Sequence, residues 1–399
     1  MASVLLLSNG HGEDLSGALI GAGLMARGIA VEALPLVGHG QAYRQRGIPI
    51  LGRTRECSTG GLGFTSFRGQ LSELLEGQVA HVLGSLLWLI RHRRRHRLVI
   101  AVGDLVAVLG AWLGGRRSAV YLVAYSSHYE GRLRLPWPCG WMLRRPSVLA
   151  VWSRDALTAH DLSQQLRRPV TFLGNPFLDA ALGPPRPASS GQVLALLPGS
   201  RLPEAAQNLE LMLQLLALLP AAGPLRAGWR VQAALVPALD AAALGPMAER
   251  QGWHWAGNDR LRRDGLDVEL VWSGFNAVLA NADLVVAMAG TATEQAVGLG
   301  RPVLQLVGDG PQFTEGFAEA QRRLLGPGVF CAPGGADRQT TLRRSATLAH
   351  DLLAQLADPR KGTDLRDQLA ATAAERIGPP GGSERLTAAI MDLLTGTHG

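Results

Sequence analysis

Short apolar segments alternate with longer amphipathic segments along most of this chain, and the alternation starts twice. In the first half, strands are predicted at residues 4–7, 31–34, 98–101, 119–123, 148–151 and 171–173, with helices at 15–27, 71–94, 105–113 and 155–166. In the second half, strands are predicted at 193–197, 231–235, 284–287 and 303–306, with helices at 204–219, 293–299 and 385–394. This alternation is typical of parallel sheets built from βαβ units. The predicted fold class is α/β, with two doubly wound domains and a cleft between them.

Residues 181–191, ALGPPRPASSG, separate the two series of elements. Their prolines, glycines and serines favour a linker over a helix or strand. We therefore expect an N-terminal domain at 1–185 and a C-terminal domain at 186–379, as the length of 399 residues also indicates. Residues 380–399 follow a second Gly/Pro break, and we expect them to form a C-terminal helix that can pack back on the N-terminal domain.

The cysteines and the apolar segments indicate the cellular compartment in which the protein is expected to function. Cys57, Cys139 and Cys331 form no CxxC or Cys/His cluster, so neither a disulfide framework nor structural zinc is predicted, and a reducing cytoplasm fits. The first apolar run, within MASVLLLSNGHGED, is short and lacks a basic flank, which indicates a strand and not a signal peptide. No apolar segment reaches the length of a membrane-spanning helix.

Positive charge is concentrated in the first half of the chain. Residues 1–185 hold 20 arginines and 11 acidic residues, a net charge of +9, whereas residues 186–399 carry a net charge of −2. A basic half indicates an anionic partner such as a phosphate, a lipid headgroup or nucleic acid. A general bias toward arginine would also raise the charge, but it would not produce the asymmetry.

Aromatic residues accompany arginines in two segments of that half. Residues 86–97, LLWLIRHRRRHR, join an apolar helix end to five arginines, and residues 125–145 combine Trp137 and Trp141 with further arginines. Such surfaces suit an anionic membrane, and a cytoplasmic protein bound to the inner face of the membrane is expected. The alternative is that the tryptophans pack on the core and the helix end is solvated. No recognised nucleic-acid module accompanies these residues, so a nucleic-acid partner is not predicted.

The segment LALLPGSR at 194–201 is the first candidate binding motif. A buried strand is followed by Gly199, which lets the backbone approach a ligand, and by Ser200, which can donate a hydroxyl or cap the next helix. Arg201 can grip a phosphate through two hydrogen bonds. An ordinary strand-to-helix turn with a surface arginine is the alternative.

The segment AMAGTATEQ at 287–295 is the second. A strand leads into small residues at a predicted helix start, where free amide groups form an anion site. The candidates are Gly290, Thr291, Ala292 and Thr293 for the anion, and Glu294 or Gln295 for ribose hydroxyls. The alternative is a helix start of small residues chosen for close packing.

The segment SNGHGED at 8–14 follows the first strand. Gly10 lies in a loop that lacks both the Walker and the GxGxxG spacing, and Asp14 is expected to cap the next helix. His11 and Glu13 are candidates for polar contacts with an acceptor, as is Asp14 if it does not serve as a cap.

Asp104 follows the strand at 98–101. A carboxylate at the carboxyl end of a strand is placed where a general base belongs, although it can equally cap the helix at 105–113. The sequence contains no DxD pair, HExxH or G-x-S-x-G, so metal-dependent transfer and a serine hydrolase are not predicted, and no cofactor or metal is expected.

Taken in order, these motifs resemble the lipid-A-disaccharide synthase family of GT-B glycosyltransferases, which have two Rossmann-like domains. The likeness is carried by LALLPGSR, by FLGNPFLDA at 172–180, by residues 281–306 and more weakly by residues 8–24. The resemblance implies an inverting, metal-independent transfer from a UDP-N-acetylglucosamine-type donor to a lipid-linked glucosamine phosphate. In this reading Arg201 matches the donor-binding arginine and Asp104 an acidic residue implicated in catalysis.

The sequence departs from the family pattern at two places. The ribose-binding glutamate of the family falls on Gln295, with Glu294 one position earlier, and the opening loop lacks the usual Ser-Gly-Asp. A related protein with another lipid acceptor therefore fits as well. Two other classes stay open: an enzyme like the UDP-sugar 2-epimerases, and a non-catalytic protein that binds sugar nucleotides or lipids.

Overall fold

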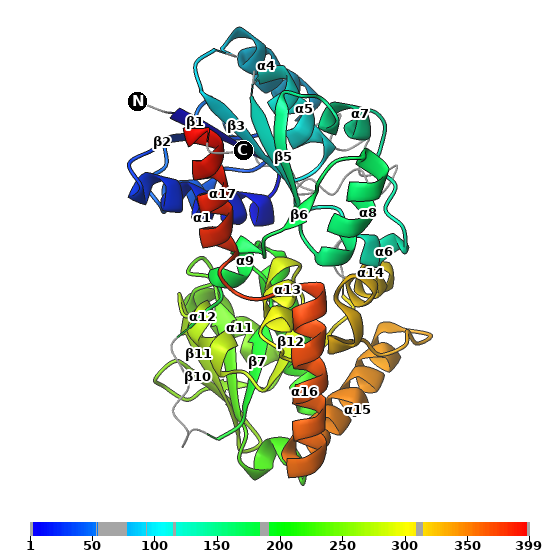
Figure 1. Cartoon of the computed structure of the whole chain (residues 1–399). Coiled ribbons are helices and arrows are strands. Elements are labelled where there is room, and N and C mark those ends of the chain that lie inside the picture. The colour runs from blue at the N-terminus through cyan, green and yellow to red at the C-terminus, as the bar shows by residue number, and fades with distance from the viewer. Residues whose placement is uncertain are drawn as a thin grey trace. The chain divides into compact units, whose positions relative to one another are not determined.

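The computed structural model describes residues 3–52, 54, 78–92, 94–114, 117–183, 191–308 and 314–396. Residues 1–179 together with 378–399 form one compact unit, unit 1, and residues 180–377 form a second, unit 2 (Figure 1). The expected domain boundary at 185/186 lies outside the described residues. The chain passes between the units twice, and its C-terminal helix belongs to unit 1.

Unit 1 is built around a parallel sheet. In the described part of the chain, its six strands have the order β2-β1-β3-β4-β5-β6. They are β1 (Ser3–Ser8), β2 (Ala30–Pro35), β3 (Leu98–Val102), β4 (Ser118–Leu122), β5 (Val148–Ser153) and β6 (Thr171–Phe172). The helices are α1 (His11–Ala26), α2 (Gln41–Arg44), α4 (Gln78–Arg91), α5 (Leu105–Gly114), α6 (Ser127–Glu130), α7 (Cys139–Leu143), α8 (Ala156–Leu166), α9 (Pro176–Asp179) and α17 (Gly382–Thr395).

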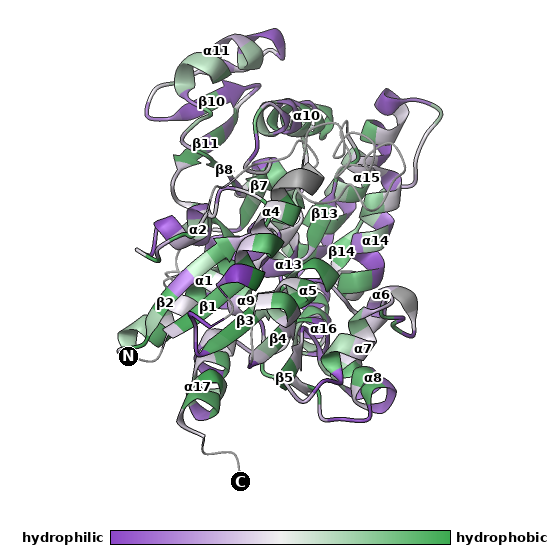
Figure 2. Cartoon of the chain, turned by 90° about the horizontal axis from the view of Figure 1, so that it is seen from above, coloured by the Kyte–Doolittle hydropathy of each residue, from purple (hydrophilic) through white to green (hydrophobic). Residues whose placement is uncertain are grey.

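Both faces of this sheet are covered, and for this reason its strands are apolar without interruption. Along β1, Val4 and Leu6 pack on one face with α1 and α17, whereas Leu5 and Leu7 pack on the other with α4, α5 and α7. Figure 2 shows central strands of the sheets in the hydrophobic colour along their length.

The C-terminal helix α17 completes one of these faces. Leu386 and Ile390 lie in the same buried cluster as Val4 of β1, and Arg27 of α1 forms an ion pair with Glu384. Figure 1 shows α17, in red, beside α1, in blue. The core of unit 1 is therefore assembled from both ends of the chain.

Unit 2 has a larger, mostly parallel sheet. Within the described residues its order is β14-β13-β12-β7-β8-β11-β10-β9, with β9 and β10 antiparallel. The strands are β7 (Val193–Leu197), β8 (Arg230–Leu235), β9 (His254–Trp255), β10 (Arg260–Arg263), β11 (Leu266–Trp272), β12 (Leu284–Ala287), β13 (Val303–Gln305) and β14 (Val329–Phe330). The helices are α10 (Glu204–Leu218), α11 (Ala241–Arg250), α12 (Phe275–Asn281), α13 (Thr291–Gly298), α14 (Glu315–Leu325), α15 (Arg338–Ala357) and α16 (Pro359–Arg376), with 3-10 turns at Pro224–Ala227 and Gly326–Gly328.

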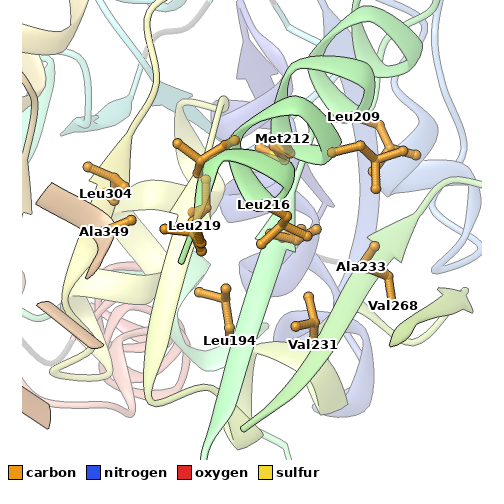
Figure 3. Close-up of a cluster of buried hydrophobic side chains, with 14 of the residues drawn as sticks. Leu194, Leu209, Met212, Leu216, Leu219, Val231, Ala233, Val268, Leu304 and Ala349 are labelled. Atoms are coloured by element: carbon orange, nitrogen blue, oxygen red, sulfur yellow. The ribbon is translucent and has the colours of Figure 1, made fainter. Parts of the chain in front are cut away.

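Helix α10 carries much of the core of unit 2. Its buried residues Leu209, Met212 and Leu216 follow the spacing of one helix face and pack on Leu194 of β7 and Val231 of β8 (Figure 3). A helix that buries such a face against a sheet gains about 2 kcal/mol for each large apolar side chain removed from water. This packing holds α10 over β7, the strand that precedes the LPGSR segment.

Each sheet contains a point where the strand order reverses. In unit 1, β2 and β3 pair on opposite sides of β1, and in unit 2, β8 and β12 pair on opposite sides of β7. In doubly wound sheets, ligands bind beyond the carboxyl ends of the strands at such a switch point. The topology therefore indicates two places for a ligand: after β1 and β3, and after β7 and β12.

The predicted elements match the structure best where they are apolar and buried. The strands predicted at 193–197 and 284–287 have the bounds of β7 and β12. The helix predicted at 15–27 begins earlier, at His11, and of the helix predicted at 71–94 the structure describes Gln78–Arg91, while 71–77 lie outside the described residues. The antiparallel strands β9 and β10 were not predicted, because arginines and other polar residues interrupt their apolar pattern.

Candidate functional site

The two motifs of unit 2 meet at the switch point of its sheet. Leu197 ends β7 in register with Ala287, which ends β12. The next amide, that of Met288, donates a hydrogen bond to the carbonyl oxygen of Leu197 at 3.0 Å. Segments that lie some 90 residues apart in the sequence therefore leave the sheet side by side.

Gly199 makes this close approach possible. Its φ of 102° is one that other residues rarely adopt, and a Cβ at this position would lie 3.2 Å from the carbonyl oxygen of Met288. Asn208 of α10 holds the loop, because its buried side-chain amide donates to the carbonyl oxygen of Pro198 at 2.8 Å. The PGSR turn is thus anchored at both its strand and its helix.

Ser200 and Arg201 are the polar side chains of this turn. Ser200 is exposed and Arg201 is half-buried. The expectation that Ser200 caps the following helix is wrong, because α10 begins only at Glu204, with Pro203 in the capping position and no side-chain cap. Among the described residues, Arg201 forms no ion pair, so its guanidinium is available to an anion.

The second loop ends at the start of α13. Gly290 occupies the capping position of this eight-residue helix, and no side chain caps it. The amides of Thr293 and Glu294 donate back to the carbonyl oxygen of Gly290, at 3.0 and 3.2 Å. The amides of Thr291 and Ala292, in the first turn, are therefore the ones that a helix start offers to an anion.

Two residues that were predicted to contact the nucleotide sugar, Thr293 and Gln295, are buried in the structure. Thr293 is fully buried, and its hydroxyl donates to the carbonyl oxygen of Ala289 at 2.7 Å. Its hydroxyl and its amide therefore both form hydrogen bonds at the start of α13. Gln295 is only 4% exposed because it lies on the buried side of α13. Glu294 is half-exposed, and of the two ribose candidates it is the one that solvent reaches.

At the switch point of unit 1, Asp104 is joined to Asn9. The side-chain amide of Asn9 donates to Oδ1 of Asp104 at 2.6 Å, and the amide of Val106 donates to the same oxygen at 2.8 Å. The second bond confirms the alternative that Asp104 caps α5. Burial raises the pKa of this carboxyl above its usual value, and the hydrogen bonds from Val106 and Asn9 oppose the rise. Asp104 is thus both a cap and a mostly buried carboxylate at the switch point of the sheet.

Asp14 is part of a buried network and does not cap a helix. Because α1 already begins at His11, Asp14 lies inside its first turn, where it is 1% exposed. Its Oδ1 accepts a hydrogen bond from the hydroxyl of Ser8 at 2.6 Å, and that hydroxyl lies 2.9 Å from the hydroxyl of the buried Tyr43. Burial raises the pKa of Asp14 from 3.8 to about 7, the Ser8 hydrogen bond opposes the rise, and the nearby charge of Glu13 adds to it.

The other candidates of this segment lie around the start of α1. Gly10 occupies the capping position without a side-chain cap, and a Cβ there would overlap the carboxylate of Glu13. His11 is exposed and Glu13 is half-buried. Solvent therefore reaches His11 and part of Glu13, whereas Asp14 is buried.

Some residues of these sites were not singled out from the sequence. Asn9, Tyr43 and Asn208 are not among the predicted site residues, although Asn9 lies in the segment at 8–14, and each contacts a partner distant in the sequence or on another element. The one local signal was for Asn9, which directly follows an apolar strand and precedes a glycine.

Aromatic and arginine side chains form a surface on unit 1, the Trp/Arg surface. Trp137 is 89% exposed, which excludes the alternative that it packs in the core. Trp112 of α5 meets Trp141 of α7 edge to face, with ring centroids 5.6 Å apart, and the guanidinium of Arg145 lies 3.8 Å from the centre of the Trp141 ring. On α4, which packs beside α5, the exposed apolar residues are Leu83, Leu87 and Ile90.

In the described part of the chain, no group of three or more His, Cys, Asp or Glu residues is arranged to hold a metal ion. No helix within the same residues has the length and apolar character needed to cross a bilayer. Cys139 is buried and Cys331 partly buried, both as free thiols, and Cys57 lies outside the described residues.

Solved structures resemble this chain along its whole length. The calicheamicin glycosyltransferase matches with a TM-score of 0.60 at 16% identity, covering 100% of both chains. The UDP-N-acetylglucosamine 2-epimerase of Neisseria meningitidis, bound to UDP-N-acetylglucosamine, matches with a TM-score of 0.54 at 14% identity, covering 99% of this chain and 100% of that one. The spinosyn rhamnosyltransferase, in complex with thymidine diphosphate, matches with a TM-score of 0.54 at 16% identity over 98% and 100%.

At these identities the likeness defines the fold, which is GT-B, as expected from the sequence. No family model matches the chain, and no curated protein sequence matches it. The resemblance to lipid-A-disaccharide synthases thus rests on the sequence motifs, two of which the structure brings together in unit 2.

Proposed function

We propose that this protein is a glycosyltransferase that moves a hexosamine-type sugar from a UDP-sugar to a lipid-linked acceptor. The observation that carries the proposal is the meeting of the PGSR turn and the start of α13 at the switch point of unit 2, through the Met288–Leu197 hydrogen bond. Arg201 and the small residues with open amides at the start of α13 follow the two paired strands there, and these groups suit a diphosphate.

In this proposal the nucleotide sugar is held by unit 2. Arg201, Ser200 and the amides of Thr291 and Ala292 would bind the diphosphate and stabilise the charge that develops on it as the sugar leaves. Glu294 would accept hydrogen bonds from the ribose hydroxyls. Because these groups supply the positive potential themselves, the proposed transfer is metal-independent.

Asp104 is the general base that we assign to the acceptor. As the acceptor oxygen attacks C1 of the sugar, Asp104 would take the proton of the acceptor hydroxyl, and the departing UDP would carry away the electron pair of the C1–O bond. Attack from the face opposite to UDP inverts the configuration at C1. The raised pKa of Asp104 makes it a stronger base than an exposed aspartate.

The Trp/Arg surface supports a lipid-linked acceptor. Exposed tryptophans suit the interfacial region of a bilayer, and arginines such as Arg145 are attracted to anionic headgroups. We therefore propose that the protein binds peripherally to the cytoplasmic face of a membrane, where such an acceptor would be found.

A second candidate is an epimerase that inverts C2 of a UDP-sugar. It is favoured by the full-length likeness to the Neisseria meningitidis epimerase. An epimerase needs the same nucleotide site but no acceptor, so the two activities are separable by experiment.

The test is to incubate the purified chain with UDP-N-acetylglucosamine, with and without vesicles that carry a lipid-linked glucosamine phosphate. The lipid fraction is analysed by mass spectrometry, and the nucleotide fraction by NMR, which distinguishes C2 epimers of equal mass. A glycosylated lipid supports the proposal. A 2-epimer formed without acceptor establishes the second candidate, and UDP binding without either product leaves a non-catalytic binding protein.

A further inference from the structure

Asn9 and Asp104 come from different strands of unit 1 and meet at the switch point of its sheet. Asn9 follows β1 directly, and Asp104 lies two residues beyond β3. Ser8 and Val102 are paired in register at the ends of these strands, which brings the two loops together. The distance of 2.6 Å from Nδ2 to Oδ1 is short, as expected when an amide donates to a carboxylate.

The backbone leaves room for this contact at Gly103. Its φ is 144°, and a Cβ at this position would overlap Oδ1 of Asn9. Any other residue at position 103 would therefore displace the Asn9 side chain. The absence of a side chain at 103 is required for Asn9 to reach Asp104.

Two of the hydrogen bonds to the carboxylate reach the same oxygen. The side chain of Asn9 and the amide of Val106 both donate to Oδ1, and Oδ2 accepts neither of these bonds. Oδ1 is thus held by two donors, one in the loop after β1 and one in α5. A hydrogen bond from the amide of Ala107 also lowers the pKa of this carboxyl.

Two titratable neighbours of Asp104, Tyr125 and Cys139, add no positive charge to it. Tyr125 accepts the amide of Leu105 at 3.1 Å, and the charge of Asp104 contributes, after burial, to the raised pKa of its hydroxyl. Cys139 of α7 is buried, and its thiol pKa rises to about 12, chiefly through burial and then through Asp104. Both groups are neutral at physiological pH, and it is hydrogen bonds such as that of Asn9 that oppose the rise in the pKa of Asp104 caused by burial.

We propose that Asn9 is a positioning residue that holds Asp104 through Oδ1 and so orients its carboxylate toward the acceptor hydroxyl. The inference rests on the proposed function, in which Asp104 is the general base. It goes beyond the sequence analysis, because Asn9 is not among the candidates of the segment at 8–14 and its contact with Asp104 depends on the pairing of β1 with β3.

Two substitutions of Asn9 in the full-length chain separate its role from a merely structural one. Asn9→Ala removes the donor, and Asn9→Asp keeps the shape but replaces the donor by a like charge. The matched control is Asn175→Asp, because Asn175 is also a buried asparagine of unit 1, donating to the carbonyl oxygen of Arg154 at 2.8 Å. The readout is the pH profile of kcat/KM for sugar transfer.

Without the Asn9 hydrogen bond, Asp104 holds its proton to higher pH, so the acidic limb of the profile moves upward. We expect a shift of about one pH unit for Asn9→Ala, the size of one hydrogen bond to a charged group, and a larger shift for Asn9→Asp. Asn175→Asp should leave the limb in place even if it lowers Tm. A limb that stays in place in both Asn9 variants would overturn the inference.

A second measurement does not depend on activity. Asp104→Asn is introduced both into the parent chain and into the Asn9→Ala variant, and the change in unfolding free energy that it causes is followed from pH 4 to pH 8. The pH at which Asp104 loses its proton should be higher by about one unit when Asn9 is replaced. If this shift appears but none of the tested acceptors is glycosylated, the proposed function fails and the Asn9–Asp104 contact stands. If transfer is observed and neither measurement shifts, Asn9 has no positioning role.

Discussion

The amide of Met288 donates to the carbonyl oxygen of Leu197 at 3.0 Å, and this bond joins the loop after β12 to the loop after β7. The contact exists because β12 and β7 are paired to their last residues, Ala287 and Leu197. It places Arg201 and the start of α13 at the same edge of the sheet. The predictions for unit 2 follow from this relationship.

Replacing Arg201 by alanine should weaken the binding of UDP by about 1.5–3 kcal/mol, the loss typical of a hydrogen bond to a charged group. Calorimetry of UDP binding measures the change. Arg250→Ala, at an exposed arginine in the last turn of α11, is the matched control and should bind UDP normally. Equal affinities of the Arg201 variant and the parent would exclude Arg201 from the site.

Gly199→Ala should destabilise the protein by about 1–3 kcal/mol, because alanine is strained at a φ of 102° and its Cβ would press on the carbonyl oxygen of Met288. Gly290→Ala is the structural control, since no atom lies within 4 Å of a Cβ at that position. Thermal unfolding should show a lower Tm for the first variant only. A normal Tm for Gly199→Ala would mean that the two loops can separate at little cost.

Asp104→Asn should leave donor binding unchanged and lower turnover at least about 100-fold, as expected when a general base is lost. Turnover and UDP affinity are measured on the same preparation. Asparagine keeps an oxygen that can accept the amide of Val106, so the α5 cap is largely preserved. Near-normal turnover would reduce Asp104 to a helix cap, and Glu13 would become the next candidate for the base.

The stability of the protein should depend on pH through Asp14. Its pKa is about 7 in the folded state and near 3.8 when unfolded, so between these values the folded state holds a proton that the unfolded state has lost. The resulting stabilisation is present at low pH and is lost as pH rises through 7. From pH 8 to pH 5 the parent should gain about 3 kcal/mol relative to Asp14→Asn. Urea unfolding of both proteins tests this, and parallel pH curves would contradict it.

The Trp/Arg surface should bind anionic vesicles and release them as salt rises, because each arginine near the surface contributes about 1 kcal/mol that salt screens. Replacing Trp137 and Trp141 by alanine should lower the part of the binding that resists salt. Trp255→Ala, at a 40% exposed tryptophan of unit 2, is the control. Equal sedimentation with neutral and anionic vesicles would argue against membrane binding through this surface.

Local sequence determined the elements of the fold wherever a segment is buried on both faces. Strands such as Val193–Leu197 and Leu284–Ala287 are uninterrupted apolar runs, and the covered faces of a parallel sheet demand such runs. Glycines and small residues likewise marked the places where the chain turns after the carboxyl ends of the strands. Each of these signals depends only on residues that are neighbours in the sequence, so it can be recognised without the structure.

Only the tertiary structure decided which of the candidate groups are free to bind a ligand. Thr293 and Asp14 are polar residues in promising motifs, yet packing buries them and directs their hydrogen bonds inward. The contact of Asn9 with Asp104, 95 residues away, depends on β1 pairing with β3. Whether a polar side chain is free is set by neighbours that the fold brings together from distant parts of the chain, and no local pattern records those neighbours.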